Sequence, residues 1–125
     1  MAPEEPRIRA HFLSPVPRGR PTGARARGQG ENRLCGDLVE LFLAVEGQRV
    51  TALGYEAQGC SSVQATASLV CEELRGASLE QARGLDVTAL VRASGGLPPA
   101  KAHAPRVVQR ALAGALADHL SQCHP

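Results

Sequence analysis

The sequence predicts an α+β fold, in which helices pack on one face of a small antiparallel sheet. Two β-rich stretches separated by a turn occupy residues 38–57, and helical spacing of apolar residues follows from residue 61 onwards. Strands followed by helices are typical of α+β domains, whereas α/β folds alternate the two. No internal repeat is present, so a repeat architecture is not expected.

The predicted strands lie between residues 24 and 57. The apolar, β-rich run Leu38–Val45 indicates a buried strand. Glu46–Gln48 form the expected turn, and the loose alternation over Arg49–Ala57 predicts a strand that pairs back as a hairpin. A weak edge strand is expected at residues 24–27, where small and charged side chains alternate.

Helices are expected through the second half of the chain. Ser61 or Ser62 can cap the first of them, and Ser78 begins a capping-box spacing. Asp86 is expected to open a further short helix, and Pro105 fits the first position of the last one. The apolar stripes are Val63, Ala67, Val70 and Leu74 on the first helix, and Val108, Leu112, Ala115 and Leu116 on the last.

Length and composition favour one domain without a membrane-spanning segment. The 125 residues are 43% hydrophobic but only 2% aromatic, so the core must consist of Ala, Val and Leu. No apolar run approaches the roughly 20 residues that span a bilayer, and no signal peptide is expected at the start. The four cysteines contain no CxxC pair and do not resemble a secreted disulfide framework, so we expect a reducing, cytoplasmic location.

Residues 1–23 predict a poorly ordered, Arg- and Pro-rich leader with a short helix around Ile8–Phe12, ahead of one domain over residues 24–125. Over residues 1–33 the chain has seven arginines and three acidic residues, which is a charge pattern of nucleic-acid-binding arms. Phe12 is the only aromatic residue there that could stack on a base. A poorly ordered segment is therefore favoured, and nucleic acid is not expected as a partner.

Four ligand-capable residues stand at expected junctions between elements. Cys35 and Asp37 flank Gly36 in a turn just before a strand, Cys60 lies at a strand–helix corner, and His103 precedes the last helix. Two thiolates, an imidazole and a carboxylate can form a tetrahedral set for Zn²⁺. Thiolates with imidazole also suit a [2Fe–2S] cluster. Spacing alone leaves each residue open as an ordinary core, turn or loop residue.

The other two cysteines are expected outside this site. Cys71 follows Cys60 by eleven positions, which is roughly 16 Å along the same helix, too far to share an ion. It is therefore assigned to the core. Cys123 lies in the C-terminal tail beside two histidines, where a frayed terminus is favoured over a metal-binding tail.

Four motifs occur in a fixed order with wide separations: Cys35-Gly36-Asp37, Gly59-Cys60-Ser61, Leu97-Pro98-Pro99-Ala100-Lys101 and His103. In this order the chain resembles the IscU/NifU N-terminal family of iron–sulfur cluster assembly scaffolds, from about Ile8 to Leu120. The resemblance implies an α+β fold with a three-stranded sheet. It also implies a cluster site of three cysteines, an aspartate and a histidine.

Carried over by position, the resemblance implies that Cys35, Asp37, Cys60 and His103 bind a [2Fe–2S] cluster or iron, with zinc as a further candidate. Asp37 matches the aspartate that tunes cluster stability and release. Leu97–Lys101 resembles the stretch that an Hsp70-type chaperone grips, with Ala100 in place of valine, and would display an extended peptide. A rigid connector is the alternative for this segment. The implied partners are a cysteine desulfurase, the chaperone and client apoproteins.

One position departs from the family pattern, because Ala104 stands where the family has its third cysteine. Alanine can neither bind a metal nor accept sulfur from a desulfurase, and the adjacent Pro105 is unusual at that place. Two functions stay open: a scaffold or carrier that transfers iron or a [2Fe–2S] cluster to clients, and a degenerate paralogue that binds zinc or no metal and acts as a partner-binding or regulatory module. No catalytic arrangement stands out in the sequence, so an enzyme is not expected.

Overall fold

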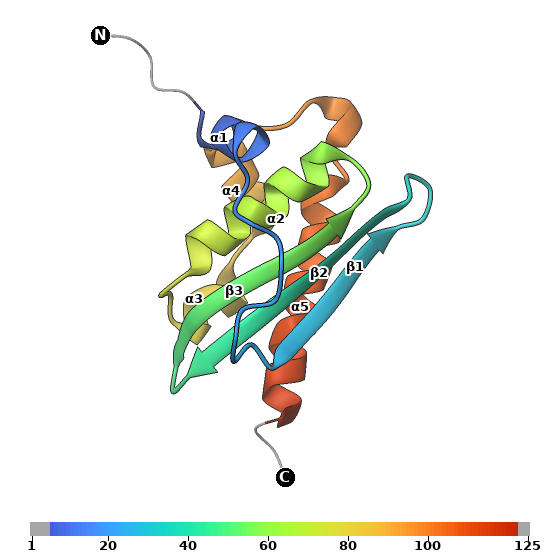
Figure 1. Cartoon of the computed structure of the whole chain (residues 1–125). Helices are drawn as coiled ribbons and strands as arrows, with labels where there is room; N and C mark the ends of the chain where they lie inside the picture. Colours follow the sequence, from blue (N-terminus) through green and yellow to red (C-terminus); the bar gives the residue numbers. More distant parts are fainter. Residues whose placement is uncertain (1–5, 123–125) are drawn as a thin grey trace, which may run out of the picture.

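Three antiparallel strands form one sheet in the computed structural model, which describes residues 6–122 (Figure 1). β1 (Ala26–Asn32), β2 (Asp37–Glu46) and β3 (Arg49–Gln58) lie in the order β1–β2–β3. The helices packed against them are α1 (Arg7–Leu13), α2 (Ser61–Leu74), α3 (Leu79–Gly84), α4 (Val87–Ala93) and α5 (Ala104–Gln122), with a 3₁₀ turn, η1 (Pro99–Lys101), before α5. The predicted α+β class and three-stranded antiparallel sheet are confirmed.

The core lies between the sheet and the two long helices. Val39, Leu41 and Leu43 alternate along β2 and are at most 1% exposed. They join the apolar residues of α2 and α5 in one buried cluster. The stripe predicted for α5 belongs to this cluster, with Val108, Leu112 and Ala115 buried and Leu116 partly buried.

The strand register brings three chain segments to one end of the sheet. Asn32 pairs with Asp37 across the β1–β2 turn, and Leu38 pairs with Gln58 where β3 ends. The turn at residues 33–36 and the corner between β3 and α2 are therefore neighbours. This end lies at the upper right of Figure 1.

Glycines in β1 allow α5 to lie directly against the strand. A Cβ at Gly28 would collide with the backbone of Ala111, and one at Gly30 would collide with the carbonyl of Val107. No side chain therefore separates the two backbones at these points. The contact near Val107 holds the beginning of α5 close to the end of β1.

The short helices begin where their capping residues predict. The Ser78 hydroxyl accepts the Gln81 N–H, and the Gln81 side chain accepts the Ser78 N–H, which completes the predicted capping box. The Asp86 carboxylate accepts the Ala89 N–H at the start of α4. Each cap satisfies a backbone donor that the first turn of a helix leaves unpaired.

The start of α2 differs from the prediction that Ser61 or Ser62 caps it. Cys60 is the N-cap, with extended backbone angles and no side-chain capping bond, and Ser61 is already helical. The preceding Gly59 has a φ of +114°, so the chain turns at the glycine and the helix starts early. The Cys60 carbonyl accepts hydrogen bonds from the backbone N–H of Val63 and, more weakly, from that of Gln64.

Residues 6–23 pack against the domain, in contrast to the poorly ordered leader expected over residues 1–23. The predicted short helix is present as α1, and it lies against α2 with Ile8 and His11 buried. Burial of Ile8, which is 4% exposed, supplies the apolar contact that the composition of this segment does not suggest. Residues 1–5 lie outside the described part of the chain.

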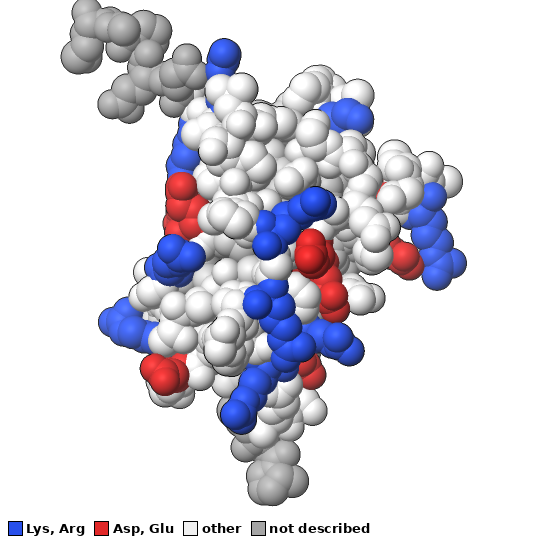
Figure 2. Space-filling model, in the orientation of Figure 1, with Lys and Arg blue, Asp and Glu red and all other residues white. Residues whose placement is uncertain are grey.

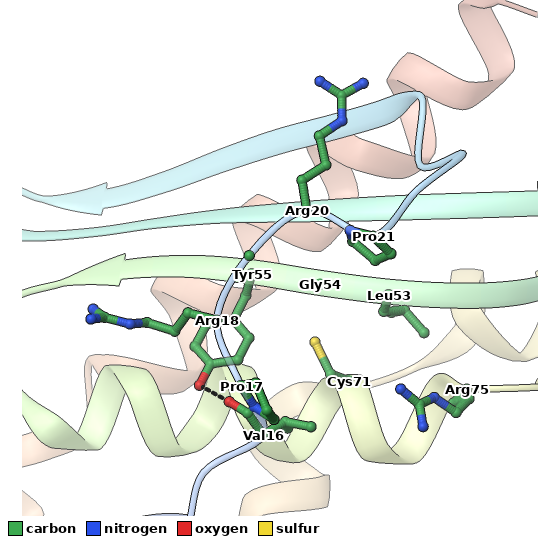
Figure 3. A pocket seen from close by; sticks show the side chains of 11 residues that line it. Val16, Pro17, Arg18, Arg20, Pro21, Leu53, Gly54, Tyr55, Cys71 and Arg75 are labelled. Atoms are coloured by element: carbon green, nitrogen blue, oxygen red, sulfur yellow. Dashed lines mark hydrogen bonds between the residues drawn. The ribbon is translucent and has the colours of Figure 1, made fainter.

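Residues 15–23, here called the strap, cross the free edge of β3 (Figure 3). The Val16 N–H donates to the Ser68 hydroxyl (2.8 Å), and the Val16 carbonyl accepts from the Tyr55 hydroxyl (2.6 Å). The Gly19 N–H then donates to the backbone carbonyl of Tyr55 (2.8 Å). The strap is thus hydrogen-bonded to both α2 and β3.

Charged side chains of both signs are spread over the sheet face that the helices leave open (Figure 2). Arg27 and Glu40 approach to 3.9 Å there, and the Arg20 guanidinium lies 5.8 Å from the Phe42 ring centroid. Some of the arginines that suggested a nucleic-acid arm therefore have contacts within the protein. Among the described residues, no helix has the length and apolar character needed to cross a bilayer.

Candidate metal centre

Cys35 and Asp37 come from the tight turn between β1 and β2. Gly36 adopts a φ of +70°, a left-handed conformation that costs glycine little. The Cys35 N–H donates to the Asn32 carbonyl (3.2 Å). Cys35 is exposed, whereas Asp37 is 2% exposed. The turn thus places a thiol at the surface and a carboxylate in the interior, two residues apart.

Asp37 joins three segments of the chain through its two carboxylate oxygens. Oδ1 accepts the backbone N–H of Cys60 (2.9 Å), and Oδ2 lies 2.7 Å from Nε2 of His103. A buried carboxylate without such partners would be strongly destabilising. Asp37 therefore ties β2 to the start of α2 and to the residue before α5.

Gly59 provides the space for this carboxylate. A Cβ at Gly59 would collide with Oδ1 of Asp37 and would lie 2.8 Å from its Cα, and the positive φ also favours glycine. Sequence reasoning included Gly59 in a motif but assigned it no role of its own. The available signal was a glycine directly before a cysteine at a strand–helix corner.

His103 is placed by the start of α5. Its carbonyl accepts the N–H groups of Arg106 and Val107, and its side chain is 22% exposed. The contact between Nε2 and Asp37 fixes the orientation of the ring. A carboxylate behind an imidazole is the arrangement that orients metal-binding histidines in many proteins.

Cys35, Asp37 and His103 each offer one ligand atom, and these atoms lie within 4.8 Å of one another. We call them the donor group. Sulfur, oxygen and nitrogen donors suit zinc and iron, so their chemistry fits the predicted cargo. Cys60, the fourth predicted ligand, contacts the group through its backbone N–H, but its half-buried thiol is not part of it.

Ala104, at the position of the missing cysteine, is the first residue of α5. It is fully buried and packs in the main core. Pro105 is also buried and is the second helical residue, one position later than predicted. The methyl group of Ala104 supplies no donor atom, so this position cannot contribute to the centre.

The segment Leu97–Lys101 precedes the centre in the chain. Pro98 is extended, but Pro99–Lys101 form η1, with the Lys101 N–H donating to the Pro98 carbonyl (2.8 Å). The expected extended peptide is therefore present only at its beginning. Leu97 packs against the core, whereas Pro98, Pro99 and Ala100 are exposed.

Cys71 belongs to the core, as predicted. It is 5% exposed, and burial raises the pKa of its thiol to about 12. Figure 3 shows its sulfur between α2 and β3, close to the strap. Cys123, for which a frayed terminus was expected, lies outside the described residues.

Comparison with known proteins agrees with this fold and these motifs. The family model described as "NifU-like N terminal domain" matches residues 4–124. The iron–sulfur cluster assembly scaffold protein IscU 1 of Archaeoglobus fulgidus is 31% identical over 109 residues, which cover 87% of this chain and 71% of that protein. The corresponding IscU of Aquifex aeolicus is 30% identical over 112 residues, which cover 88% and 71%.

A solved structure gives the same result for the fold. The N-terminal part of a nitrogen-fixing NifU-like protein from Brucella abortus superposes with a TM-score of 0.74, covering 94% of each chain at 18% identity. At this identity the similarity concerns the fold alone. The family match over nearly the whole sequence establishes more: this chain belongs to the NifU-like N-terminal domain family.

Proposed function

We propose that this chain is an iron–sulfur cluster assembly scaffold or carrier, which binds iron or a [2Fe–2S] cluster and passes it to client proteins. The observation that carries the proposal is the donor group, in which residues from the β1–β2 turn and from the start of α5 meet within 4.8 Å. The named relatives at 31% and 30% identity are iron–sulfur cluster assembly scaffolds. A regulatory paralogue without cargo is not favoured by these relatives.

The proposed ligands are Cys35, Asp37, Cys60 and His103. Four protein donors match the need of a [2Fe–2S] cluster, in which each iron takes two ligands besides the bridging sulfides. A carboxylate is a harder and poorer partner for a cluster than a thiolate, so the bound cargo should be labile. Lability suits a protein that must release what it binds.

The surface around Cys35 supports transfer to another protein. Cys35 is exposed, and its neighbour Leu34 is 97% exposed at the tip of the turn. A client can therefore approach the thiol without unfolding the core. The segment Leu97–Lys101 is the proposed contact of an Hsp70-type chaperone, and Pro98, Pro99 and Ala100 within it are exposed.

A cysteine desulfurase is the proposed sulfur donor, and client apoproteins are the proposed recipients. Ala104 removes the cysteine that the family resemblance implies as the main sulfur acceptor. The proposed location is the cytoplasm, where reducing conditions keep Cys35 and Cys60 as free thiols.

Anaerobic reconstitution with iron and sulfide tests the proposal, because it needs no desulfurase. The wild-type chain should develop visible absorption with equal amounts of iron and acid-labile sulfide. Cys35→Ala should lose this absorption, whereas Cys71→Ala, which changes a cysteine outside the site, should keep it. A wild-type chain that takes up neither iron nor sulfide, and that is purified anaerobically with zinc or no metal, would contradict the proposal.

The effect of having alanine instead of cysteine at residue 104 can be tested in the same assay. Ala104→Cys adds a thiolate at the position where the family has one, so the cluster should persist longer after exposure to a chelator. An unchanged lifetime would show that this position does not reach the cargo.

A further inference from the structure

A cavity of about 280 Å³ adjoins the donor group. It is bounded by the end of β1, the β1–β2 turn and the first two turns of α5, and His103 belongs to both the cavity and the donor group. The charged residues around it are Glu31, Arg33, Arg106 and Arg110. We call this cavity the basic pocket.

The basic pocket carries an excess of positive charge. Arg33 pairs with the Glu31 carboxylate (3.1 Å), and Arg110 reaches only the Glu31 backbone carbonyl (3.4 Å). Arg106 makes no side-chain hydrogen bond or ion pair with the residues described. Within residues 6–122, the Arg106 and Arg110 guanidinium groups, one helical turn apart on α5, therefore have no carboxylate partner. Guanidinium groups bind carboxylates and phosphates through paired, charge-assisted hydrogen bonds.

The donor group beside this pocket supplies three ligand atoms, one fewer than a tetrahedral metal takes. The Cys60 thiol, proposed above as the fourth ligand of a two-iron cluster, is not part of this group, so a single metal ion held there has three protein ligands. Ala104 contributes no ligand atom. Metal sites with three protein ligands commonly take an external ligand in the fourth position.

We propose, building on the function proposed above, that the basic pocket binds the carboxylate of a small thiol whose thiolate completes the coordination of a metal held by the donor group. Sulfur is the donor type that iron and zinc favour, and the arginines recognise the carboxylate. The thiol gives its proton to solvent as the metal–sulfur bond forms, and nothing is oxidised or reduced. The small molecule thus takes the place of the side chain that position 104 lacks.

The first experiment uses the metal-free chain, so that it tests the pocket alone. Glutathione and S-methylglutathione should both bind in calorimetric titrations, and the binding should weaken as salt increases. The double variant Arg106→Ala/Arg110→Ala should bind both about tenfold more weakly, since charge-assisted hydrogen bonds to the carboxylates are lost. Both arginines are exposed, so the fold should tolerate the change. Arg83→Ala on α3 is the matched control and should bind like the wild type. Equal binding by the double variant would overturn the proposal.

The second experiment uses the chain loaded with Co²⁺, whose thiolate charge-transfer absorption reports sulfur ligands. Glutathione should increase this absorption, S-methylglutathione should not, and 2-mercaptoethanol, which lacks a carboxylate, should require a far higher concentration. A cobalt spectrum that glutathione leaves unchanged, or that 2-mercaptoethanol changes equally well, would overturn the pocket proposal alone. A wild-type chain that binds no cobalt would instead contradict the proposed metal centre.

Discussion

Cys35 and Cys71 are the same side chain in opposite environments. Cys35 lies exposed in a turn, with ligand atoms of Asp37 and His103 within 4.8 Å. Cys71 lies in α2 beneath the strap, where burial raises the pKa of its thiol to about 12 (Figure 3). A thiol of this kind behaves as a small apolar group rather than as a ligand. The environment, more than the residue type, therefore decides which cysteine can carry chemistry.

The backbone differs between these two regions as well. Around Cys35 the chain needs left-handed glycines, Gly36 and Gly59, to bring a turn and a strand–helix corner together. Around Cys71 the chain is a regular helix whose small residues pack against the sheet. The first region is specified by a few particular residues, whereas the second depends on an apolar pattern.

The largest expected difference between the two cysteines is their rate of alkylation. With a pKa of about 12, the thiolate fraction of Cys71 at pH 7 is on the order of a thousandfold below that of a free cysteine. Iodoacetamide should therefore label the peptide with Cys35 long before the peptide with Cys71. Mass spectrometry of native and urea-unfolded protein measures both rates. Equal labelling of the two peptides in the native protein would contradict the expected difference between Cys35 and Cys71.

The second largest expected effect is that of Gly59→Ala, in the region around Cys35. The added Cβ would collide with Asp37, and the left-handed conformation adds strain of about 1–2 kcal/mol. We expect loss of metal uptake together with a lower free energy of unfolding. Gly47→Ala is the matched control, because Gly47 also has a positive φ but no atom near the added Cβ. It should lose stability and keep metal uptake, as urea unfolding and metal analysis would show.

Serine substitutions should give opposite results at the two cysteines. Cys71→Ser places a hydroxyl in the core and should lower the free energy of unfolding by about 1–3 kcal/mol while metal uptake continues. Cys35→Ser, at an exposed turn, should change stability by less than about 0.5 kcal/mol and abolish cluster formation. Urea unfolding and reconstitution distinguish the two outcomes. Loss of the cluster in Cys71→Ser without unfolding would require a revised site.

The smallest expected effect concerns Glu72, the neighbour of Cys71. A hydrogen bond from Arg7 lowers the pKa of the Glu72 carboxyl below its usual value. The resulting stabilisation is present above the unfolded-state pKa and is lost as the pH falls through the lower folded-state pKa. Because both side chains are exposed, Arg7→Ala should cost only a few tenths of a kcal/mol at pH 7. Urea unfolding at pH 7 and pH 3 should show this cost shrinking in acid, with Arg83→Ala as the control.

Much of the fold follows from local patterns in the sequence. The apolar run Leu38–Val45 and the alternation Arg49–Ala57 predict β2 and β3 to within one residue at each end. The strand expected at residues 24–27 is displaced, because β1 at Ala26–Asn32 has the glycines and charged residues that strand propensities disfavour. Its pairing with β2 and the close approach of α5 override that local preference.

The site could be predicted only in part. The motifs identified Cys35, Asp37 and His103, which the structure brings together. They could not show that both oxygens of Asp37 are engaged, nor that the Cys60 thiol lies apart from the donor group. The basic pocket also escaped sequence reasoning, because Arg33 and Arg106 are far apart in the chain and meet only through the packing of α5 on β1.

The strap has a consequence for self-association. β3 is an outer strand of the sheet, and Gly19 pairs with its backbone at Tyr55. A chain trimmed to begin at Ala24 would lose this pairing and present unpaired backbone groups along an apolar strand. Such edges add strands from neighbouring molecules. We therefore expect residues 15–23, part of the segment for which a poorly ordered leader was expected, to disfavour such association.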